Sequence, residues 1–275
     1  MSAARPFEMI FDGTHLRATL QPGDSGLLVV TFDYRMDGKD SFTPAEHSTT
    51  FARQGHAQLS IKTRRNDWFI NPETDVLDAA LRGFSDGYAR VHMLGYSMGG
   101  YGALRFADAL GATSLVAVSP QVSIHPAQAP WERRYNAEAP GFDPVLGDLA
   151  AHPAPGLRGL VLLDPFIRQD RAHGRRICAL FAGLRMVPLG FGGHPASQVI
   201  RGAGKRWVID RATVQPRPQP GLILRTHRDG RRQAPGYWLR LARFCANRRP
   251  ALAALALERA QALGAPGARV SDPPA

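Results

Sequence analysis

The sequence predicts an α/β fold in which helices flank a mostly parallel central sheet and a helical hairpin follows at the C-terminal end. Three apolar runs, at residues 27–32, 115–118 and 160–163, have the nearly continuous apolar character of strands buried on both faces of a sheet. Segments with helical spacing alternate with these runs, which is typical of parallel strands joined by helices. The chain has 275 residues, of which 44% are hydrophobic and 21% charged, so it can bury a sizeable core.

The expected elements can be placed in order along the chain. A short hairpin comes first, with strands at 7–11 and 15–20 joined by a turn at Asp12-Gly13. Further strands are expected at 27–32, 59–63, 91–95, 115–118, 160–163 and 185–189. Helices are expected at 76–84, 99–110, 171–184, 237–246 and 251–263, and the last two of these form the C-terminal helical hairpin.

We expect these elements to form a main domain over residues 1–203, which contains a short, proline-rich, cap-like insertion at 119–159. Residues 204–263 are expected to form a basic, helical C-terminal extension. Residues 264–275 are rich in Pro, Gly and Ser, so they predict a disordered tail.

Positive charge is concentrated near the C-terminal end. The formal net charge is +11, and residues 201–250 hold thirteen Lys or Arg against two acidic residues, which equals the whole excess. Such a region could bind an anionic partner such as a phosphate, an acidic glycan or a membrane surface. A solvated, arginine-rich face is the alternative interpretation.

The sequence predicts neither secretion nor a membrane span. Charged residues are spread through residues 1–20, and no apolar run approaches the roughly 18 residues that a spanning helix needs. The two cysteines, Cys178 and Cys245, are too few for a disulfide framework. We therefore expect a cytoplasmic protein.

A candidate nucleophile lies where a strand meets a helix. Gly95, Ser97 and Gly99 form the pattern G-x-S-x-G directly after the strand expected at 91–95 and before a helix. Because the chain must turn sharply here, small residues are needed on either side of a serine with strained backbone angles. The turn would hold the serine hydroxyl over the C-terminal edge of the sheet. The alternative is a glycine-rich turn that binds phosphate or has no chemical role, although the dinucleotide-binding and Walker patterns are both absent.

With the segment Gly95-Tyr96-Ser97-Met98-Gly99-Gly100, the chain resembles the α/β-hydrolase superfamily over roughly residues 7–203. In that family the nucleophile is followed along the chain by an acid and then by a histidine, each on a loop after a strand. The resemblance implies that Ser97 is the nucleophile. It also implies that the backbone N–H of Met98, in the first turn of the following helix, donates to the oxyanion.

The resemblance also selects a base and an acid. His194 follows a short apolar segment and Gly192-Gly193, which matches the place of the family's base, whereas a surface-loop histidine is the alternative. Two aspartates follow the strand at 160–163. The family's usual position, just before the next helix, favours Asp170 as the acid, and Asp164 is the alternative. A helix N-cap for Asp170 and a turn residue for Asp164 are the structural interpretations.

Further residues are expected around this site. The family often has His-Gly after the strand at 27–32, but this chain has Phe32-Asp33-Tyr34, so position alone selects the backbone N–H of Tyr34 as the second oxyanion donor. Three aromatic residues are candidates for substrate binding: Trp68, Tyr96 and Trp131. Tyr135 could line the site beside Trp131, and a Trp68 buried in the core is equally compatible with the sequence.

These residues predict a serine hydrolase that cleaves a carboxylic ester or thioester of a small acyl substrate through Ser97, His194 and Asp170. An acyltransferase that passes the acyl group to a sugar or another alcohol would use the same residues. A non-catalytic module that binds anionic partners through residues 201–250 is a hypothesis from a different class. The chemistry needs no cofactor, and neither H-E-x-x-H nor paired Cys-x-x-Cys is present to predict a metal site.

Overall fold

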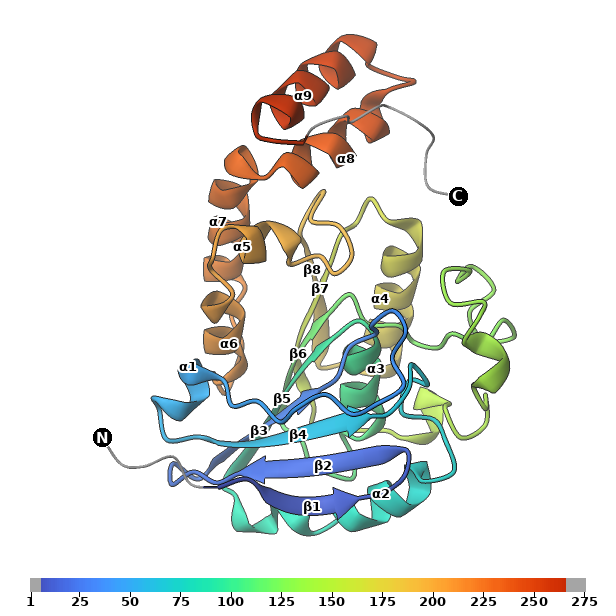
Figure 1. Ribbon diagram of the computed structural model, residues 1–275, viewed down its shortest axis with the longest axis vertical. Helices are drawn as coiled ribbons and strands as arrows, with labels where there is room; N and C mark the ends of the chain where they lie inside the picture. The colour runs from blue at the N-terminus through green and yellow to red at the C-terminus, as the bar shows by residue number, and fades with distance from the viewer. Residues whose placement is uncertain (1–5, 266–275) are drawn as a thin grey trace.

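A mixed sheet forms the centre of the molecule (Figure 1). The computed structural model describes residues 6–265, and within that range eight strands lie in the order β1-β2-β4-β3-β5-β6-β7-β8. Their bounds are β1 (Glu8–Asp12), β2 (Leu16–Gln21), β3 (Leu27–Phe32), β4 (Ala57–Thr63), β5 (Arg90–Tyr96), β6 (Ser114–Val118), β7 (Arg158–Leu163) and β8 (Leu184–Pro188). Strand β2 runs antiparallel to both of its neighbours, whereas the strands from β4 across to β8 are parallel.

Helices cover both faces of this sheet. Their bounds are α1 (Thr49–Ala52), α2 (Thr74–Leu81), α3 (Met98–Arg105), α4 (Arg168–Leu180), α5 (Gln198–Gly202), α6 (Trp207–Thr213), α7 (Gly221–Gly230), α8 (Pro235–Cys245) and α9 (Pro250–Ala262). Figure 1 shows α2, α3 and α4 on one face, and α1 and α6 on the other.

Alternate residues of a central strand face the two helical layers. In β3, Leu28 packs in the same core as Tyr101 of α3, whereas Val29 packs in the core that contains Ile209 of α6. Side chains alternate across a strand with a period of two. A nearly continuous apolar run is therefore what a strand covered on both faces requires.

The strands agree with the sequence better than the helices do. All eight predicted strands are present, and the strand predicted at 27–32 has those bounds in the structure. The helix predicted at 99–110 ends at Arg105, because residues up to Gly111 continue as turns. The sequence analysis missed α1, α5, α6 and α7. The first two have four and five residues, too few to show a period, and the other two flank the prolines at 216–220.

Helix α6 belongs to the core of the sheet. Its residues Val208, Ile209 and Ala212 are buried together with Leu94 of β5 and Val116 of β6. The boundary predicted at residue 203 lies just before α6, so the first part of the predicted extension completes the second helical layer.

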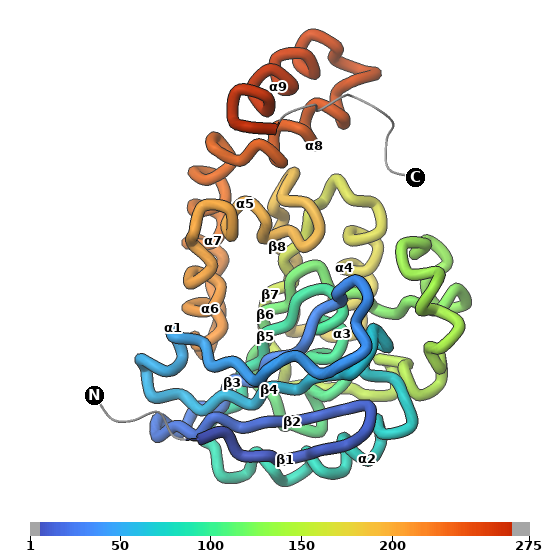
Figure 2. The backbone as a smooth tube through the Cα atoms, in the orientation of Figure 1, coloured from blue at the N-terminus to red at the C-terminus, as the bar shows by residue number. Residues whose placement is uncertain are grey.

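Helices α8 and α9 pack against each other and extend beyond the sheet, as Figure 2 shows. Of the tail predicted at 264–275, residues 266–275 lie outside the described residues. No helix between residues 6 and 265 combines the length and the apolar character needed to cross a bilayer.

Strand β1 forms one edge of the sheet. Its register with β2 shifts between Met9 and Phe11, so that β1 carries one extra residue at a β-bulge. Two apolar side chains near this edge are partly open to solvent, with Phe7 44% and Met9 51% exposed.

Replacing Ile209 by Ala should lower the free energy of unfolding by about 2–5 kcal/mol, because this 1% exposed side chain would leave a cavity between α6 and the sheet. Urea unfolding measures the change. Leu255→Ala on α9 is the matched control, since that side chain is 63% exposed and its loss should cost less than about 0.5 kcal/mol. An equally small effect for Ile209→Ala would show that α6 is not part of the core.

Candidate active site

The turn between β5 and α3 holds Ser97 in a strained conformation. Its φ of 51° and ψ of −118° lie in a region that residues with a β-carbon rarely adopt. A β-carbon at Gly95 would lie 2.2 Å from the carbonyl oxygen of Gly99, and one at Gly99 would lie 2.5 Å from that of Asp33. The two glycines of the motif are therefore needed for this turn. The second contact also brings the loop after β3 directly against it.

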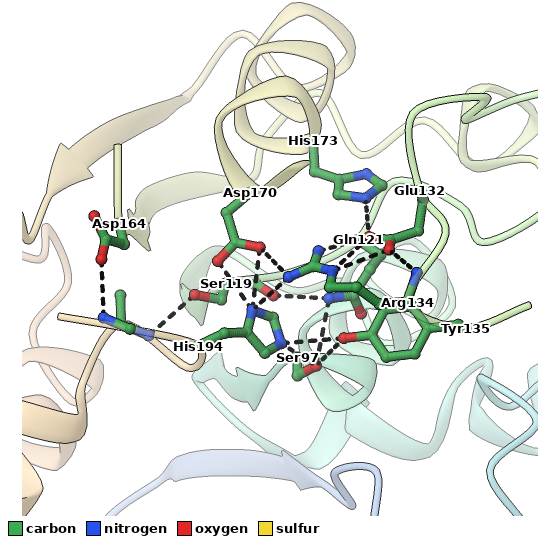
Figure 3. A network of polar contacts seen from close by, with 12 residues as sticks. Ser97, Ser119, Gln121, Glu132, Arg134, Tyr135, Asp164, Asp170, His173 and His194 are labelled. Atoms are coloured by element: carbon green, nitrogen blue, oxygen red, sulfur yellow. Dashed lines mark hydrogen bonds and ion pairs between the residues drawn. The ribbon is translucent and has the colours of Figure 1, made fainter. Parts of the chain in front are cut away.

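The structure brings together the three residues predicted as nucleophile, base and acid (Figure 3). The Oγ atom of Ser97 lies 2.9 Å from Nε2 of His194. On the other side of the imidazole, Nδ1 lies 2.9 and 3.1 Å from the two carboxylate oxygens of Asp170. Ser97 and Asp170 are buried, whereas the side chain of His194 is 21% exposed. This geometry fits Nδ1–H donating to Asp170 and Nε2 accepting from Ser97.

Asp170 is buried but ionised. It lies in the first turn of α4, where the helix dipole favours negative charge. Burial on its own would raise the pKa of this carboxyl. The hydrogen bond from His194 and the positive charge of Arg134 outweigh that effect and hold the pKa below its ordinary value. Asp170 is therefore an acceptor at neutral pH, able to orient His194.

The alternative acid, Asp164, has a different set of partners. Its carboxylate accepts hydrogen bonds from the backbone N–H groups of Phe166, Phe191 and Gly193, at 2.9–3.1 Å. The last two belong to the His194 loop, which we define as residues 189–195. Asp164 therefore shapes the loop that carries the histidine.

Arg134 joins Asp170 to a second buried carboxylate. Its Nη1 donates to Asp170 at 2.8 Å and lies 3.3 Å from Nδ1 of His194, while Nε donates to Glu132 at 2.9 Å. Glu132 also accepts from Nε2 of His173 at 2.9 Å, and Nδ1 of His173 accepts from the backbone N–H of Val122. These two bonds fix the neutral tautomer of His173, whose pKa is lowered by burial despite the neighbouring carboxylate.

Gln121 and Tyr135 contact the side chain of Ser97 directly. Trp68 donates its Nε1–H to Oε1 of Gln121 at 3.0 Å, so the amide nitrogen of Gln121 must face the other way. That nitrogen donates to the carbonyl of Ser119 at 3.0 Å and lies 3.3 Å from Oγ of Ser97. The hydroxyl of Tyr135 lies 3.1 Å from Nε2 of His194 and 3.4 Å from Oγ of Ser97.

The aromatic residues predicted to bind substrate lie in different places. Trp68 is fully buried and packs against the ring of Tyr135, so it supports the site from inside the core. Trp131 packs edge-on against His173, behind the Glu132 carboxylate. Tyr96 packs on the face of the sheet that α6 covers, whereas Trp68 lies in the core on the other face.

One predicted oxyanion donor, Met98, lies at the elbow itself. Met98 is the first residue of α3, so its N–H has no acceptor within the helix. The other predicted donor, Tyr34, lies in the loop after β3, next to Asp33, whose carbonyl lies close to Gly99, and its side chain is 53% exposed. Between residues 6 and 265, no three His, Cys, Asp or Glu side chains gather as the ligands of a metal ion would.

The sequence analysis missed Gln121, Glu132 and Arg134. All three lie in the proline-rich segment after β6, where neither helical nor strand periodicity is present. One signal was available for Gln121, because it follows the carboxyl end of the strand next to β5, and ligand sites of α/β sheets lie at that edge.

The stability of the protein should depend on the ionisation of Glu132. Hydrogen bonds from His173 and Arg134 outweigh burial and lower the pKa of Glu132 from 4.5 to about 2. A lowered pKa stabilises the fold above pH 4.5, and this stabilisation is lost as the pH falls toward 2. The difference in free energy of unfolding between the natural protein and Glu132→Gln, measured with urea, should therefore be largest near pH 7 and should decrease from about pH 5 to about pH 2. A difference in free energy of unfolding that does not change with pH would contradict the ionised state of Glu132 in the folded protein.

Comparison with known proteins identifies the fold. No family model and no curated protein matches the sequence, whereas solved structures do match the chain. A variant of the capsule O-acetyltransferase of Neisseria meningitidis serogroup A, in complex with CoA, is similar with a TM-score of 0.50 and 14% identity, over 72% of this chain and 93% of that one.

Two further solved structures are similar at lower TM-scores. Est1E from Butyrivibrio proteoclasticus has a TM-score of 0.44 and 15% identity, over 74% of this chain and 98% of its own. MPT51 of Mycobacterium tuberculosis has a TM-score of 0.45 and 15% identity, over 77% of this chain and 100% of its own. Identity this low bears on the fold alone. Taken with the strand order and the elbow at Ser97, the match at a TM-score of 0.50 shows that this chain has the α/β-hydrolase fold.

Proposed function

We propose that this protein is a serine hydrolase that cleaves a carboxylic ester or thioester through an acyl-enzyme intermediate. The observation that supports the proposal is the unbroken chain of hydrogen bonds from Ser97 through His194 to Asp170, which begins at a strained strand–helix turn. Such a chain supplies what a serine hydroxyl lacks at neutral pH, namely a base within reach and an acceptor that orients the base.

The reaction follows from these positions. Ser97 Oγ attacks the acyl carbon while Nε2 of His194 takes the hydroxyl proton, and Asp170 stabilises the imidazolium that forms. The backbone N–H groups of Met98 and Tyr34 are the proposed donors to the oxyanion, and the N-terminus of α3 adds its dipole. When the intermediate collapses, His194 protonates the leaving oxygen or sulfur. Water then attacks the acyl-enzyme with His194 again as base, which releases the carboxylic acid and restores Ser97.

Gln121 is proposed to set the direction of the Ser97 hydroxyl. Because its N–H donates to Oγ, it occupies a lone pair of that oxygen, and the serine proton is left to donate to His194. Trp68 fixes the amide in this orientation. Gln121 is fully buried, so water does not compete for these contacts.

Tyr135 is proposed to contact the leaving group and the attacking water. Its hydroxyl lies beside Nε2 of His194, where a leaving oxygen must receive its proton. Burial raises the pKa of Tyr135, so the phenol stays neutral and can donate a hydrogen bond.

A fluorophosphonate probe tests the nucleophile. It should label Ser97 in the natural protein, because the activated oxygen displaces fluoride from phosphorus, and the labelled peptide can be mapped by mass spectrometry. Ser97→Ala should abolish labelling, and Asp170→Asn should slow both labelling and ester hydrolysis by about 10³–10⁴-fold.

Ser114→Ala is the matched control. It removes a buried hydroxyl at the first residue of β6, at the edge of the sheet away from Ser97, and it should be labelled like the natural protein. Two results would contradict the proposal that Ser97 is the nucleophile. One is labelling of Ser97→Ala at the rate of the natural protein, and the other is a folded natural protein that the probe does not label.

The role of Gln121 predicts a graded series. Gln121→Leu leaves the Ser97 hydroxyl free to rotate away from His194 and should slow labelling by about tenfold to a hundredfold. Trp68→Phe keeps most of the ring but frees the amide to rotate, so it should have a smaller effect in the same direction. The second-order rate of probe labelling measures both. An unchanged rate for Gln121→Leu would exclude a contribution of Gln121 to the reactivity of Ser97.

A further inference from the structure

The C-terminal helices α7 and α8 contact the backbone of the His194 loop. Arg240 of α8 donates from Nε to the carbonyl of Phe191 at 2.9 Å. Its Nη1 donates to Oε1 of Gln198 at 3.0 Å, and the amide of Gln198 donates to the carbonyl of His194 itself at 2.7 Å. His227 of α7 contacts the carbonyl of Gly190 through Nε2 at 3.0 Å. Two carbonyls of this loop are therefore bound directly by α7 and α8, and that of His194 is bound through Gln198 of α5.

Two N–H groups of the same loop bond to a carboxylate. Asp164, at the end of β7, accepts from the N–H groups of Phe191 and Gly193. The loop thus has two donors bound by a carboxylate, and one of its acceptors is bound by a guanidinium. In total, five backbone groups of the loop bond to side chains, and these bonds restrict the movement of the segment.

Gly193 permits the close approach of Arg240. Its φ of +84° is a left-handed conformation, and a β-carbon at this position would lie 2.9 Å from Cζ of Arg240. The guanidinium therefore packs directly on the peptide that precedes His194. Gly193 therefore makes room for this contact, whereas a β-carbon at Gly192 would lie 2.2 Å from the carbonyl oxygen of Ala196.

Arg240 differs from most arginines of residues 201–250. Arg225, Arg228, Arg231, Arg232 and Arg243 are exposed, whereas Arg240 is half-buried and its donors reach across to the loop. The exposed arginines cannot make the contacts of Arg240, because these contacts need a planar guanidinium placed beside the loop.

We infer that Arg240 is a positioning residue for His194, so that the C-terminal helices are part of the catalytic unit. The inference rests on the proposed hydrolase function. The base acts only if Nε2 stays within hydrogen-bond reach of Ser97, at the 2.9 Å seen here, and a displacement of about 1 Å can cost about a hundredfold in rate. Arg240 and Gln198 fix the peptide that carries the imidazole, and Asp170 fixes its ring.

The test compares Arg240→Met with Arg243→Met, an exposed arginine on the same helix. Activity on a p-nitrophenyl ester gives kcat and KM, and hydrogen exchange measures the amides of residues 189–195. Arg240→Met should lower kcat by about tenfold to a hundredfold and change KM by less than about threefold, because the base is displaced while substrate contacts remain. Exchange in the loop should rise, and Arg243→Met should match the natural protein in every measurement.

Chemical rescue separates positioning from a general loss of structure. In Arg240→Ala, millimolar guanidinium should restore part of kcat, because the space between Gly193 and Gly236 fits that ion, whereas equimolar ammonium should not. Failure of guanidinium to raise kcat above the ammonium control would contradict the inference. So would an Arg240→Met variant whose kcat and loop exchange equal those of Arg243→Met.

The experiment also separates this inference from the proposed function. If the natural protein hydrolyses no ester and Ser97 is not labelled, the proposed function fails, and with it the catalytic part of the inference. Loop exchange that still rises in Arg240→Met would support the contact of α8 with the His194 loop. Normal activity of the natural protein together with unchanged kcat in Arg240→Met would overturn the inference alone.

Discussion

The backbone conformation of Ser97 is the constraint on which the rest of the site depends. A residue with a β-carbon adopts its φ of 51° at a cost of about 1–3 kcal/mol, so the surrounding structure must impose it. Strand β5 is bonded on both sides, to β3 and to β6, and α3 is buried along its length. Both elements therefore resist relaxation of the turn. The parallel sheet then fixes where the other groups must come from, because the ends of β3, β6, β7 and β8 converge on the same edge.

Charged side chains of alternating sign form a series that begins beside His194. Asp170, Arg134 and Glu132 form an anion–cation–anion series, and the series ends at a neutral His173. A single buried carboxylate would tend to take up a proton. Here the guanidinium lies between two of them and lowers the pKa of both. This arrangement keeps Asp170 ionised as the acceptor for His194, although its carboxylate has almost no contact with solvent.

The sequence predicted the parts of the molecule that have a local pattern. The strands were found because burial on both faces leaves continuous apolar runs, and Ser97 because its glycines are sterically required. His194 and Asp170 were predicted through the chain order of a family, and the structure places them in contact with each other and His194 in contact with Ser97. Gln121, Glu132 and Arg134 were missed, because their positions depend on the path of an irregular segment that no periodicity describes. Helix α6 shows the same limit: its apolar residues have helical spacing, but its membership of the core depends on long-range packing against β5 and β6.

The bulge in β1 has a consequence for the behaviour of the molecule in solution. Strand β1 is an edge, so its outer backbone groups could pair with a strand of another molecule, and the exposed Phe7 and Met9 beside it would favour such contact. The extra residue interrupts the regular spacing of donors and acceptors and increases the local twist. The bulge therefore makes this edge a less regular template for pairing with a strand of another molecule.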